Sequence, residues 1–388
     1  MRKDISLYIH IPFCIRKCNY CDFLSFSCTD ILEHKEYILA LCEEISDYKV
    51  VAQEYIVRTI FIGGGTPSLI DKEFVELIML TVREIWLVSD DAEITIEGNP
   101  DSLSHDKLLS YMKVGINRLS IGLQSANNNE LKLLGRPHNF DQFKAAYVRA
   151  REVGFSNINI DIMAALPGQT FQSYGNTLAE VLTLMPEHIS AYSLIVEENT
   201  PFFENQDIIS MLPNEDVDRL MYSQTKRLLK NSGYSRYEIS NYAKKGFECR
   251  HNLVYWTGKE YLGFGIGAAS LINHERFSNI ANIEEYEKKK GKDVYEEKIV
   301  IGTKEQMEEY MFLGLRLTSG ISISLFQNKF ETSIWDVYSK VIEKYIHQDL
   351  LLIDGDSIRL TDAGIDISNM ILSEFLLADP IFPAVILS

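Results

Sequence analysis

Three cysteines near the start of the chain, Cys14, Cys18 and Cys21, stand in a CxxxCxxC spacing. Thiolate sulfur is the ligand that iron–sulfur clusters and zinc select. Three such ligands on one short loop can hold three corners of a cubane cluster and leave the fourth iron open. An open metal position is where a substrate or cofactor coordinates, whereas a closed four-ligand site is structural. We therefore interpret the rest of the chain as support for this loop.

The alternatives to an iron–sulfur site are a zinc site, a disulfide or incidental cysteines. Zinc ribbons usually bring two separated cysteine pairs, and no second pair follows this loop. Cys28 is a less favoured fourth ligand, because it stands alone seven residues after Cys21. The spacing favours an iron–sulfur cluster, with zinc and incidental cysteines left open.

Composition limits the class of protein and the compartment. A chain of 388 residues suits a large α/β domain with a smaller appendage. The formal net charge of −17 argues against nucleic-acid binding, which needs basic surface. Neither a secretory signal nor an apolar run of membrane-spanning length is present, and the apolar tail at 381–387 is too short to span a bilayer. We expect a reducing, cytoplasmic location, where an oxidation-prone cluster survives.

Strand-like apolar runs alternate with amphipathic stretches through about the first half of the chain, as in parallel βα units. The predicted strands are 5–11, 59–62, 93–97, 118–123, 157–163 and 189–195. The predicted helices are 30–48, 71–86, 104–114, 140–153 and 174–184. Six units are too few for a closed eight-stranded barrel. We therefore expect an open, curved parallel sheet with function at the carboxyl ends of its strands.

The rhythm changes after about residue 201. A helix is predicted at 214–232, and the last part of the chain is predicted to hold helices at 304–317, 324–330 and 333–347. A hairpin is predicted around Asp354-Gly355, because Asp-Gly between apolar arms is a strong turn signal. Helices followed by a hairpin indicate a winged-helix-like domain. Its helix at 333–347 is not enriched in Lys or Arg, so a lid or docking role is favoured over DNA binding. The predicted domains are 1–200, 201–300 and 301–388.

A glycine run, Gly63-Gly64-Gly65-Thr66-Pro67, follows the second predicted strand. Consecutive glycines let backbone amides approach a small polar ligand, although such a run can also be only a tight turn. Four polar side chains then stand at or just beyond strand ends. They are Glu97, Gln124, Arg136 and Asp161. Each taken singly is equally well explained as a helix cap or a solvated loop residue.

These segments together resemble the radical S-adenosylmethionine (SAM) superfamily, whose CxxxCxxC loop carries an aromatic residue before the third cysteine, here Tyr20. Within it, residues 8–14 (Tyr-Ile-His-Ile-Pro-Phe-Cys) resemble the oxygen-independent coproporphyrinogen III oxidases and their relatives, the HemW haem chaperones. The resemblance implies a partial (β/α)6 barrel with the cluster loop after the first strand. The smaller, mainly helical, winged-helix-like C-terminal domain is the one that the pattern above predicts. The resemblance also implies a 4Fe–4S cluster on the three cysteines, with SAM chelating the unique iron. The implied cofactor-binding residues are Tyr8, Tyr20, Gly64, Gly65, Thr66, Glu97, Gln124, Arg136 and Asp161.

The chain departs from the superfamily pattern at one position. At two other positions it matches the chaperone branch and differs from the coproporphyrinogen-converting branch. The aromatic-glycine pair that usually precedes Leu-Pro-Gly-Gln-Thr is here Ala164-Ala165. Members that convert coproporphyrinogen carry a further cysteine two residues after the third ligand, where this chain has Phe23. The chaperone branch has an HNxxYW motif, which matches residues 251–256. Carried over, the motif makes His251, Tyr255 and Trp256 candidate haem-contacting residues.

The sequence therefore predicts a haem chaperone that binds haem as cargo and delivers it to haem-requiring proteins. Two enzymes are the alternatives: a coproporphyrinogen III dehydrogenase, and a radical SAM enzyme that modifies or degrades haem. The predicted partners are haem or porphyrin and haem-acceptor proteins. The acceptors can include membrane haem proteins, which the chain is predicted to contact peripherally without inserting into the membrane. No nucleic-acid partner is predicted.

Overall fold

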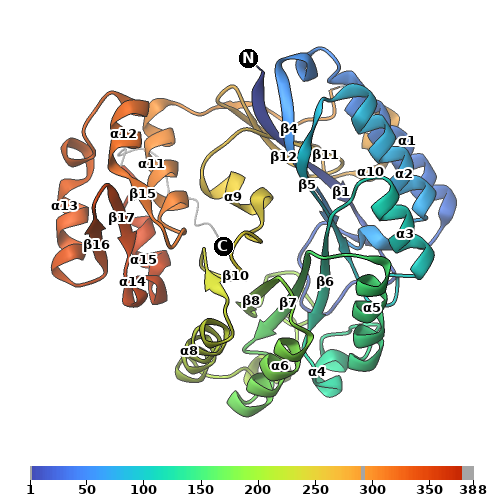
Figure 1. Cartoon of the computed structure of the whole chain (residues 1–388), viewed down its shortest axis with the longest axis horizontal. Coiled ribbons are helices and arrows are strands. Elements are labelled where there is room, and N and C mark those ends of the chain that lie inside the picture. The colour runs from blue at the N-terminus through green and yellow to red at the C-terminus, as the bar shows by residue number, and fades with distance from the viewer. Residues whose placement is uncertain (1, 290–292, 378–388) are drawn as a thin grey trace. The chain divides into compact units, whose positions relative to one another are not determined.

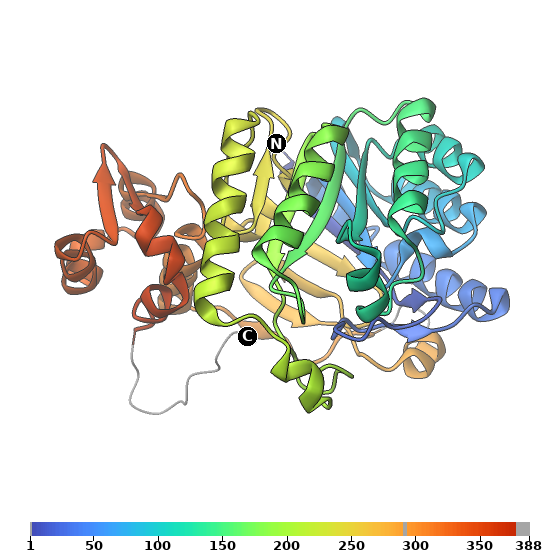
Figure 2. The same ribbon diagram turned by 90° about the horizontal axis from the view of Figure 1, so that it is seen from below.

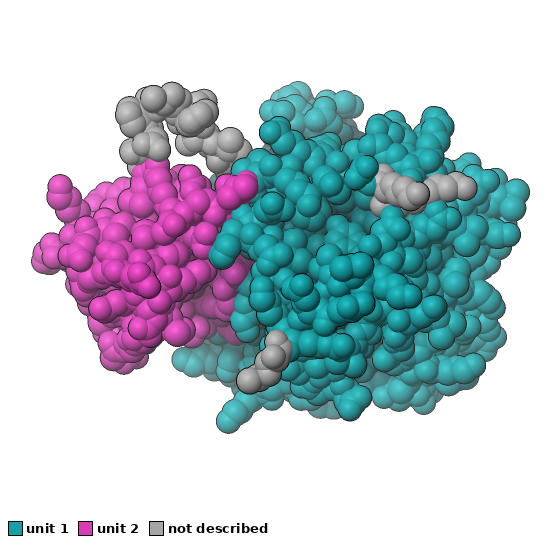
Figure 3. All heavy atoms as spheres, turned by 90° about the horizontal axis from the view of Figure 1, so that it is seen from above, with its two compact units in different colours: residues 1–236, 240–254, 259–299 teal, residues 237–239, 255–258, 300–388 magenta. Residues whose placement is uncertain are grey.

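The computed structural model describes residues 2–289 and 293–377 of the chain. The apolar tail predicted at 381–387 lies outside the described residues. The chain divides into two compact units, coloured separately in Figure 3. The first comprises residues 1–236, 240–254 and 259–299, and the second comprises 237–239, 255–258 and 300–388.

One curved sheet forms the centre of the first unit (Figure 1). Its order is β14-β13-β12-β11-β1-β4-β5-β6-β7-β8-β10-β9. The run from β11 to β8 is parallel throughout, and antiparallel strands extend it at both edges. The parallel strands are β1 (Lys3–Ile11), β4 (Tyr55–Gly64), β5 (Val88–Gly98), β6 (Arg118–Gln124), β7 (Ile158–Ala164), β8 (His188–Ser193) and β11 (Tyr261–Phe264). The edge strands are β9 (Ser235–Arg236), β10 (Asn241–Ala243), β12 (Ala269–Ile272), β13 (Glu275–Ser278) and β14 (Ile299–Val300).

All six predicted strands are confirmed, and the open sheet with them. The seventh parallel strand, β11, was not predicted from the sequence. Gly263 explains the difficulty, because an added Cβ there would stand 2.4 Å from the carbonyl oxygen of Ala269. The strand therefore needs glycine where β12 folds back on it, and glycine lowers the apparent strand propensity.

Side chains alternate between the two faces of the parallel strands. The outward face is apolar and packs under the helices, whereas most parallel sheets are apolar on both faces. The outward core includes Ile5, Leu7, Ile9, Ile94, Ile96, Leu119, Ile121, Ile158 and Ile160, all at most 2% exposed. The inward face is mostly polar and makes cross-strand contacts through Ser6, Tyr8, Thr59, Phe61, Glu93, Ser120, Asn159, Asp161 and His188. The polar residues that occupy every second position of these strands therefore form a polar interior in the folded protein.

Helices cover the outward face. They are α1 (Ile31–Asp47), α2 (Lys72–Ile85), α3 (His105–Lys113), α5 (Phe140–Val153), α6 (Phe171–Leu184), α8 (Glu215–Asn231) and α10 (Ile283–Lys289). The short helices α4 (Asn128–Leu133) and α7 (Gln206–Ser210) lie in the segments that follow β6 and β8. The helix α9 (Arg250–Trp256) instead packs on the inward face, where its His251 contacts Thr59 and Phe61. Figure 2 shows α6, in green, beside α8, in yellow-green. The five predicted helices and the one predicted at 214–232 are confirmed, whereas α4 was missed because it is only six residues long. No helix in the described ranges is long and apolar enough to cross a membrane.

The second unit has the helix and hairpin order predicted for a winged-helix-like domain. Its helices are α11 (Thr303–Gly314), α12 (Ile323–Phe330), α13 (Ile334–His347), α14 (Asp362–Asp366) and α15 (Ser368–Ser373). The hairpin is β16 (Leu351–Asp354) and β17 (Ser357–Leu360), and β15 (Ile321–Ser322) pairs with β17. Asp356 in the hairpin turn accepts hydrogen bonds from the backbone N–H and hydroxyl of Ser324, 2.9 and 2.7 Å long. The turn is thereby tied to the start of α12.

Candidate cluster and cofactor site

The three cysteines lie on the loop that follows β1, which we call the cluster loop (residues 12–28). Cys14 lies in the short strand β2 (Phe13–Cys14), and parallel pairing with β3 (Phe26–Ser27) makes the loop double back on itself. Cys14 and Cys18 are each 9% exposed, and Cys21 is half-buried. Cys28 instead donates a hydrogen bond to Glu33 on α1, 3.0 Å long, which supports the three-cysteine ligand set.

Burial governs the protonation of these thiols. It raises the pKa of Cys14, and it raises the pKa of Cys21 to about 11. At neutral pH both are thiols in the metal-free protein, so cluster assembly has to displace protons. Among the described residues, no three His, Cys, Asp or Glu side chains converge closely enough to hold a single metal ion.

The glycine run at the end of β4 packs directly against the cluster loop. Gly64 has φ +120°, and an added Cβ would stand 2.7 Å from the imidazole of His10. At Gly65 an added Cβ would stand 2.8 Å from the Phe13 carbonyl oxygen and 3.0 Å from Cys14 Sγ. The run is therefore required for close approach and is more than a tight turn.

Arg136 joins the cluster loop to the barrel interior. It is only 8% exposed, so it is not a solvated loop residue. Its Nη1 donates to Cys18 Sγ at 3.6 Å, and its Nη2 donates to Asn99 Oδ1 at 2.5 Å and to the Gly122 carbonyl at 2.9 Å. These contacts hold the loop segment that carries Cys18 against the residues that follow β5 and β6. Its Nε is buried and has no hydrogen-bond partner within the described residues, so one donor remains for a ligand.

Two predicted carboxylates, Glu97 and Asp161, face the barrel interior. Glu97 accepts a hydrogen bond from the Gly64 N–H at 3.1 Å. Burial, reinforced by the charge of Asp161, raises the pKa of Glu97 to about 8. Asp161 accepts hydrogen bonds from Asn159 and Ser120, 2.8 and 3.2 Å long, and burial raises its pKa as well. Glu97 is therefore mostly protonated at neutral pH.

The remaining predicted cofactor residues lie near the cluster loop or on the inward face of the sheet. Thr66 donates to Cys14 Sγ at 3.5 Å, and Tyr8 is bonded to His10 at 3.0 Å. Tyr20 lies beside Arg136, although burial still raises the pKa of the tyrosine. Gln124 accepts a hydrogen bond from the Tyr192 hydroxyl at 3.2 Å. The structure thus links these side chains to the cluster loop or to the inward face of the sheet.

Two positions at the carboxyl ends of β6 and β7 have a left-handed backbone conformation. Gln124 has φ +70° and Ala165 has φ +57°. Ala165 stands where the superfamily usually has glycine, so this chain adopts a glycine-like conformation with a residue that disfavours it. Such strain costs about 1–2 kcal/mol and is typical of functional sites.

Sequence reasoning missed three inward-facing residues. Asn99 donates to Thr66 Oγ1 at 3.0 Å as well as accepting from Arg136, and so couples two predicted residues. Asn159 orients Asp161, and Tyr192 orients Gln124. A signal for two of them was available, because Asn99 and Asn159 stand two residues from Glu97 and Asp161 and share their face of the strand.

The residues present fit a cluster and an amino-acid cofactor. The donor set has three soft sulfurs on one loop, a glycine cradle that an added Cβ would fill, and a buried guanidinium with an unused donor. Soft thiolates suit iron–sulfur clusters, and a guanidinium suits a carboxylate.

His251, the predicted haem ligand, lies inside the barrel and is 1% exposed. Its Nδ1 is 2.7 Å from Thr59 Oγ1, its ring packs on Phe61 with 5.2 Å between centroids, and its backbone N–H donates to Glu93 at 3.1 Å. Burial, together with the charge of Arg118, lowers the pKa of His251 to about 3. The imidazole therefore supports the barrel as a neutral group, and ligation of haem would require α9 to withdraw.

The other two residues of the motif belong to the second unit. Tyr255 and Trp256 are half-buried, and the guanidinium of Arg316 lies over the Trp256 ring, 4.6 Å from its centroid. The six residues of the motif are thus divided between the two compact units. Their predicted role as porphyrin walls stays a prediction.

His251→Ala is expected to lower the free energy of unfolding by about 2–3 kcal/mol, because it empties a packed position and removes one of the two hydrogen-bond partners of the Thr59 hydroxyl. Stability of the wild type should also fall as the pH drops below about 6.5, where the unfolded imidazole takes up a proton that the buried one does not, and the variant should lack this component. Urea unfolding at several pH values measures both. His105→Ala, at an exposed histidine on α3, is the control. A changed haem spectrum at unchanged stability would contradict the packing role and support the predicted haem ligand.

Comparison with protein families gives two matches. A family model described as the radical SAM superfamily matches residues 8–181, which contain all the elements of the cluster and cofactor site. A second, described as the HemN C-terminal domain, matches residues 301–367 in the second unit.

Similar proteins extend over nearly the whole chain. The "Heme chaperone HemW" of Lactococcus lactis is 37% identical over 380 residues, which cover 98% of this chain and 99% of the relative. The protein of the same name from Bacillus subtilis is 36% identical, with 96% and 99% covered.

A solved structure has the same fold. The Escherichia coli coproporphyrinogen III oxidase HemN, described as a radical SAM enzyme, superposes with a TM-score of 0.87 at 24% identity, covering 97% of this chain and 90% of that one. At this identity the likeness establishes the architecture alone.

Proposed function

The chain belongs to the HemW haem-chaperone family of the radical SAM superfamily, and on that premise we propose that it binds haem and hands it to haem-requiring proteins. The relatives' names supply the activity, and their full-length similarity supports carrying it over.

Superfamily membership implies a 4Fe–4S cluster and SAM. When bound, they supply an iron with an open coordination position and the capacity for one-electron chemistry. The chain's own residues bind the cluster and orient SAM. Cys14, Cys18 and Cys21 hold the cluster, Arg136 offers its buried Nε–H to the carboxylate of SAM, and Gly64–Thr66 offer backbone groups to its amino group. Glu97, Gln124 and Asp161 face the interior and are assigned to the ribose hydroxyl groups.

The identity of residue 23 is the main reason to propose a chaperone in place of a coproporphyrinogen dehydrogenase. Phe23 occupies the position of the further cysteine expected in the dehydrogenases, and it is 61% exposed. An exposed phenylalanine can provide neither a thiol nor a hydrogen atom donor of that kind. The dehydrogenase chemistry therefore lacks one of its expected groups in this chain.

The wild-type protein, reconstituted anaerobically, is expected to bind haem and to leave coproporphyrinogen III unchanged. Haem titration followed at the Soret band measures the first, and pigment chromatography after incubation with SAM and a reductant measures the second. Addition of an apo-haem protein should then move haem to the acceptor, seen as the acceptor's Soret spectrum.

A heat-denatured sample and a cluster-free sample serve as controls for adventitious haem. Decarboxylation of coproporphyrinogen at catalytic turnover would overturn the chaperone assignment and install the dehydrogenase. Conversion of haem itself to a new pigment would instead support the haem-modifying enzyme.

None of the six cysteines forms a disulfide, which fits a reducing compartment, and we propose a cytoplasmic location. Where the acceptor is a membrane haem protein, we propose that the chain contacts it at the membrane surface without inserting into the bilayer. The lid or docking role of the second unit stays a prediction.

A further inference from the structure

Two hollows flank α4 on the outside of the cluster loop. The first, of about 520 Å³, lies among the cluster loop, α4 and the loop that leads to α5, and we call it the basic hollow. The second, of about 580 Å³, lies between α4 and the segment 201–208, and we call it the apolar hollow. Asn19 and Lys132 line both, so the two hollows adjoin and form one rim groove.

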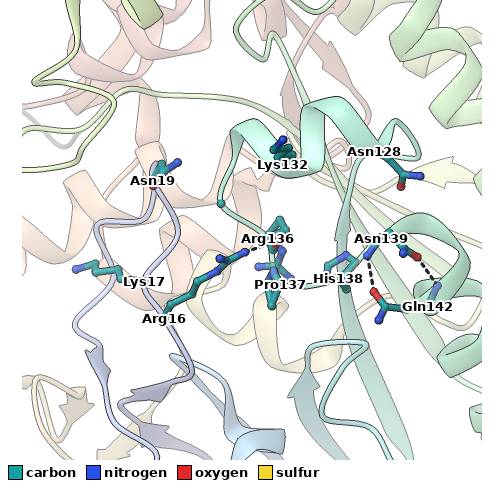
Figure 4. Close-up of a pocket in the computed structure, with 11 residues that line it drawn as sticks. Arg16, Lys17, Asn19, Asn128, Lys132, Arg136, Pro137, His138, Asn139 and Gln142 are labelled. Carbon is teal, nitrogen blue, oxygen red and sulfur yellow. Dashed lines mark hydrogen bonds between the residues drawn. The ribbon is translucent and has the colours of Figure 1, made fainter.

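The basic hollow concentrates positive charge on an acidic protein. Arg16, Lys17 and Lys132 line it and are exposed, and none of them forms an ion pair within the described ranges. Figure 4 shows Arg16 and Lys17 projecting from the cluster loop and Lys132 from the helix above. Arg16 and Lys17 donate to the carbonyl oxygens of Arg136 and Phe23, at 2.7 and 3.0 Å, which orients the cations without neutralising them. No acidic residue lines either hollow, although the chain carries 55.

A buried imidazole also lines the basic hollow. His138 is 4% exposed, and its ring interacts with the backbone of Leu123. Burial and the charge of Arg136 lower the pKa of His138 to about 3, so the ring is neutral at physiological pH and leaves the positive charge of the hollow to its exposed cations.

The apolar hollow provides the complementary surface. Leu133, Pro201, Phe202 and Ile208 line it, and Phe202 belongs to a small buried core against which Leu133 and Ile208 pack. The polar residues Asn19, Asn129, Lys132 and Asn205 complete its lining. The apolar part of this surface suits an edge of an aromatic macrocycle.

Asn19 fixes the floor between the hollows. Its backbone N–H and its side-chain N–H donate to the carbonyls of Leu134 and Leu133 at 3.0 and 2.9 Å, and its carbonyl accepts from the Phe202 N–H at 3.0 Å. Since Asn19 stands next to Cys18, the groove lies directly outside the cluster loop. The groove is therefore preformed and held by the same segment that carries the cluster ligands.

We propose that this rim groove is the haem site, with the propionate carboxylates in the basic hollow and an edge of the macrocycle in the apolar hollow. Haem combines two carboxylates with a large apolar ring, and that is the pairing that the adjoining hollows match. The inference rests on the proposed function, since it locates the cargo that function requires. It places the porphyrin on residues outside the HNxxYW segment.

The test is a haem titration of the reconstituted full-length protein, followed at the Soret band. Lys17→Glu/Lys132→Glu should weaken haem binding by about tenfold or more, because it replaces two attractive contacts by repulsive ones. Lys113→Glu/Lys230→Glu, at exposed lysines of α3 and α8, makes the same change in net charge and should leave the affinity within about twofold. Lys132→Glu alone is the second variant, because it lies outside the cluster loop, and iron and sulfide content should stay at the wild-type level.

The dimethyl ester of haem, whose propionates carry no charge, separates carboxylate recognition from ring binding. Wild type should bind the ester more weakly than haem, because the attraction to the propionates is lost. The double variant should bind the ester at least as tightly as haem, because the ester also removes the repulsion by the two glutamates. Equal haem affinity in wild type, groove variants and control would overturn the groove assignment while leaving the chaperone function standing. A wild-type protein that does not bind haem would overturn the proposed function itself, and the groove assignment with it.

Discussion

Cys18→Ala is expected to abolish the 4Fe–4S cluster, because two thiolates cannot hold three corners of a cubane. The structure adds a second reason. Cys18 Sγ also accepts the hydrogen bond from Arg136 Nη1, so the substitution removes both an iron ligand and the contact that ties the cluster loop to the barrel. Iron and sulfide analysis after anaerobic reconstitution should give values near the background of the unreconstituted protein.

The matched control for this substitution is Cys28→Ala, at a cysteine on the same loop that bonds Glu33. It should keep the wild-type cluster content. The fold should survive both changes, since Cys18 lies outside the main buried apolar core and Cys28 only packs against its edge, and circular dichroism checks this. Undiminished iron and sulfide in the Cys18 variant, or a loss of cluster in the Cys28 variant, would contradict the ligand set.

Arg136→Ala is expected to weaken SAM binding by about tenfold to a hundredfold, which corresponds to the loss of a hydrogen bond to a charged group. The physical reason is the buried Nε–H, which has no partner among the described residues and suits the carboxylate of SAM. Calorimetry on the reconstituted variant, with cluster content measured in parallel, gives the dissociation constant.

Arg136→Lys keeps the charge but not the planar fork, and should bind SAM with intermediate affinity. Arg83→Ala, at an exposed arginine of α2, controls for the loss of one positive charge. An unchanged dissociation constant in an Arg136→Ala protein with a full cluster would leave Arg136 as a support of the cluster loop only.

The sequence alone determined the features that are local in the chain. The three cysteine ligands stand within eight residues, so their spacing could be read directly. The six strands and five of the helices of the barrel could be predicted because apolar periodicity reports which face of each element is buried. The hairpin around Asp354-Gly355 was equally local. Short or glycine-bearing elements, α4 and β11, carried too little periodicity to be recognised.

Only the tertiary structure decided which side chains meet. Arg136 lies 118 residues from Cys18, and whether it was a solvated residue or a buried partner of the cluster loop depended on how the chain after α4 turns back over the strand ends. His251 looked like an available imidazole, yet α9 packs it against the inward face of β4 and β5, whose contacting residues are about 160–190 positions away in the sequence. The rim groove joins the cluster loop, α4 and the segment 201–208, so no single stretch of sequence contains it. The physical reason is common to all three. Periodicity encodes burial one element at a time, whereas contacts between distant residues are set by strand register and loop path, which follow from packing of the whole sheet.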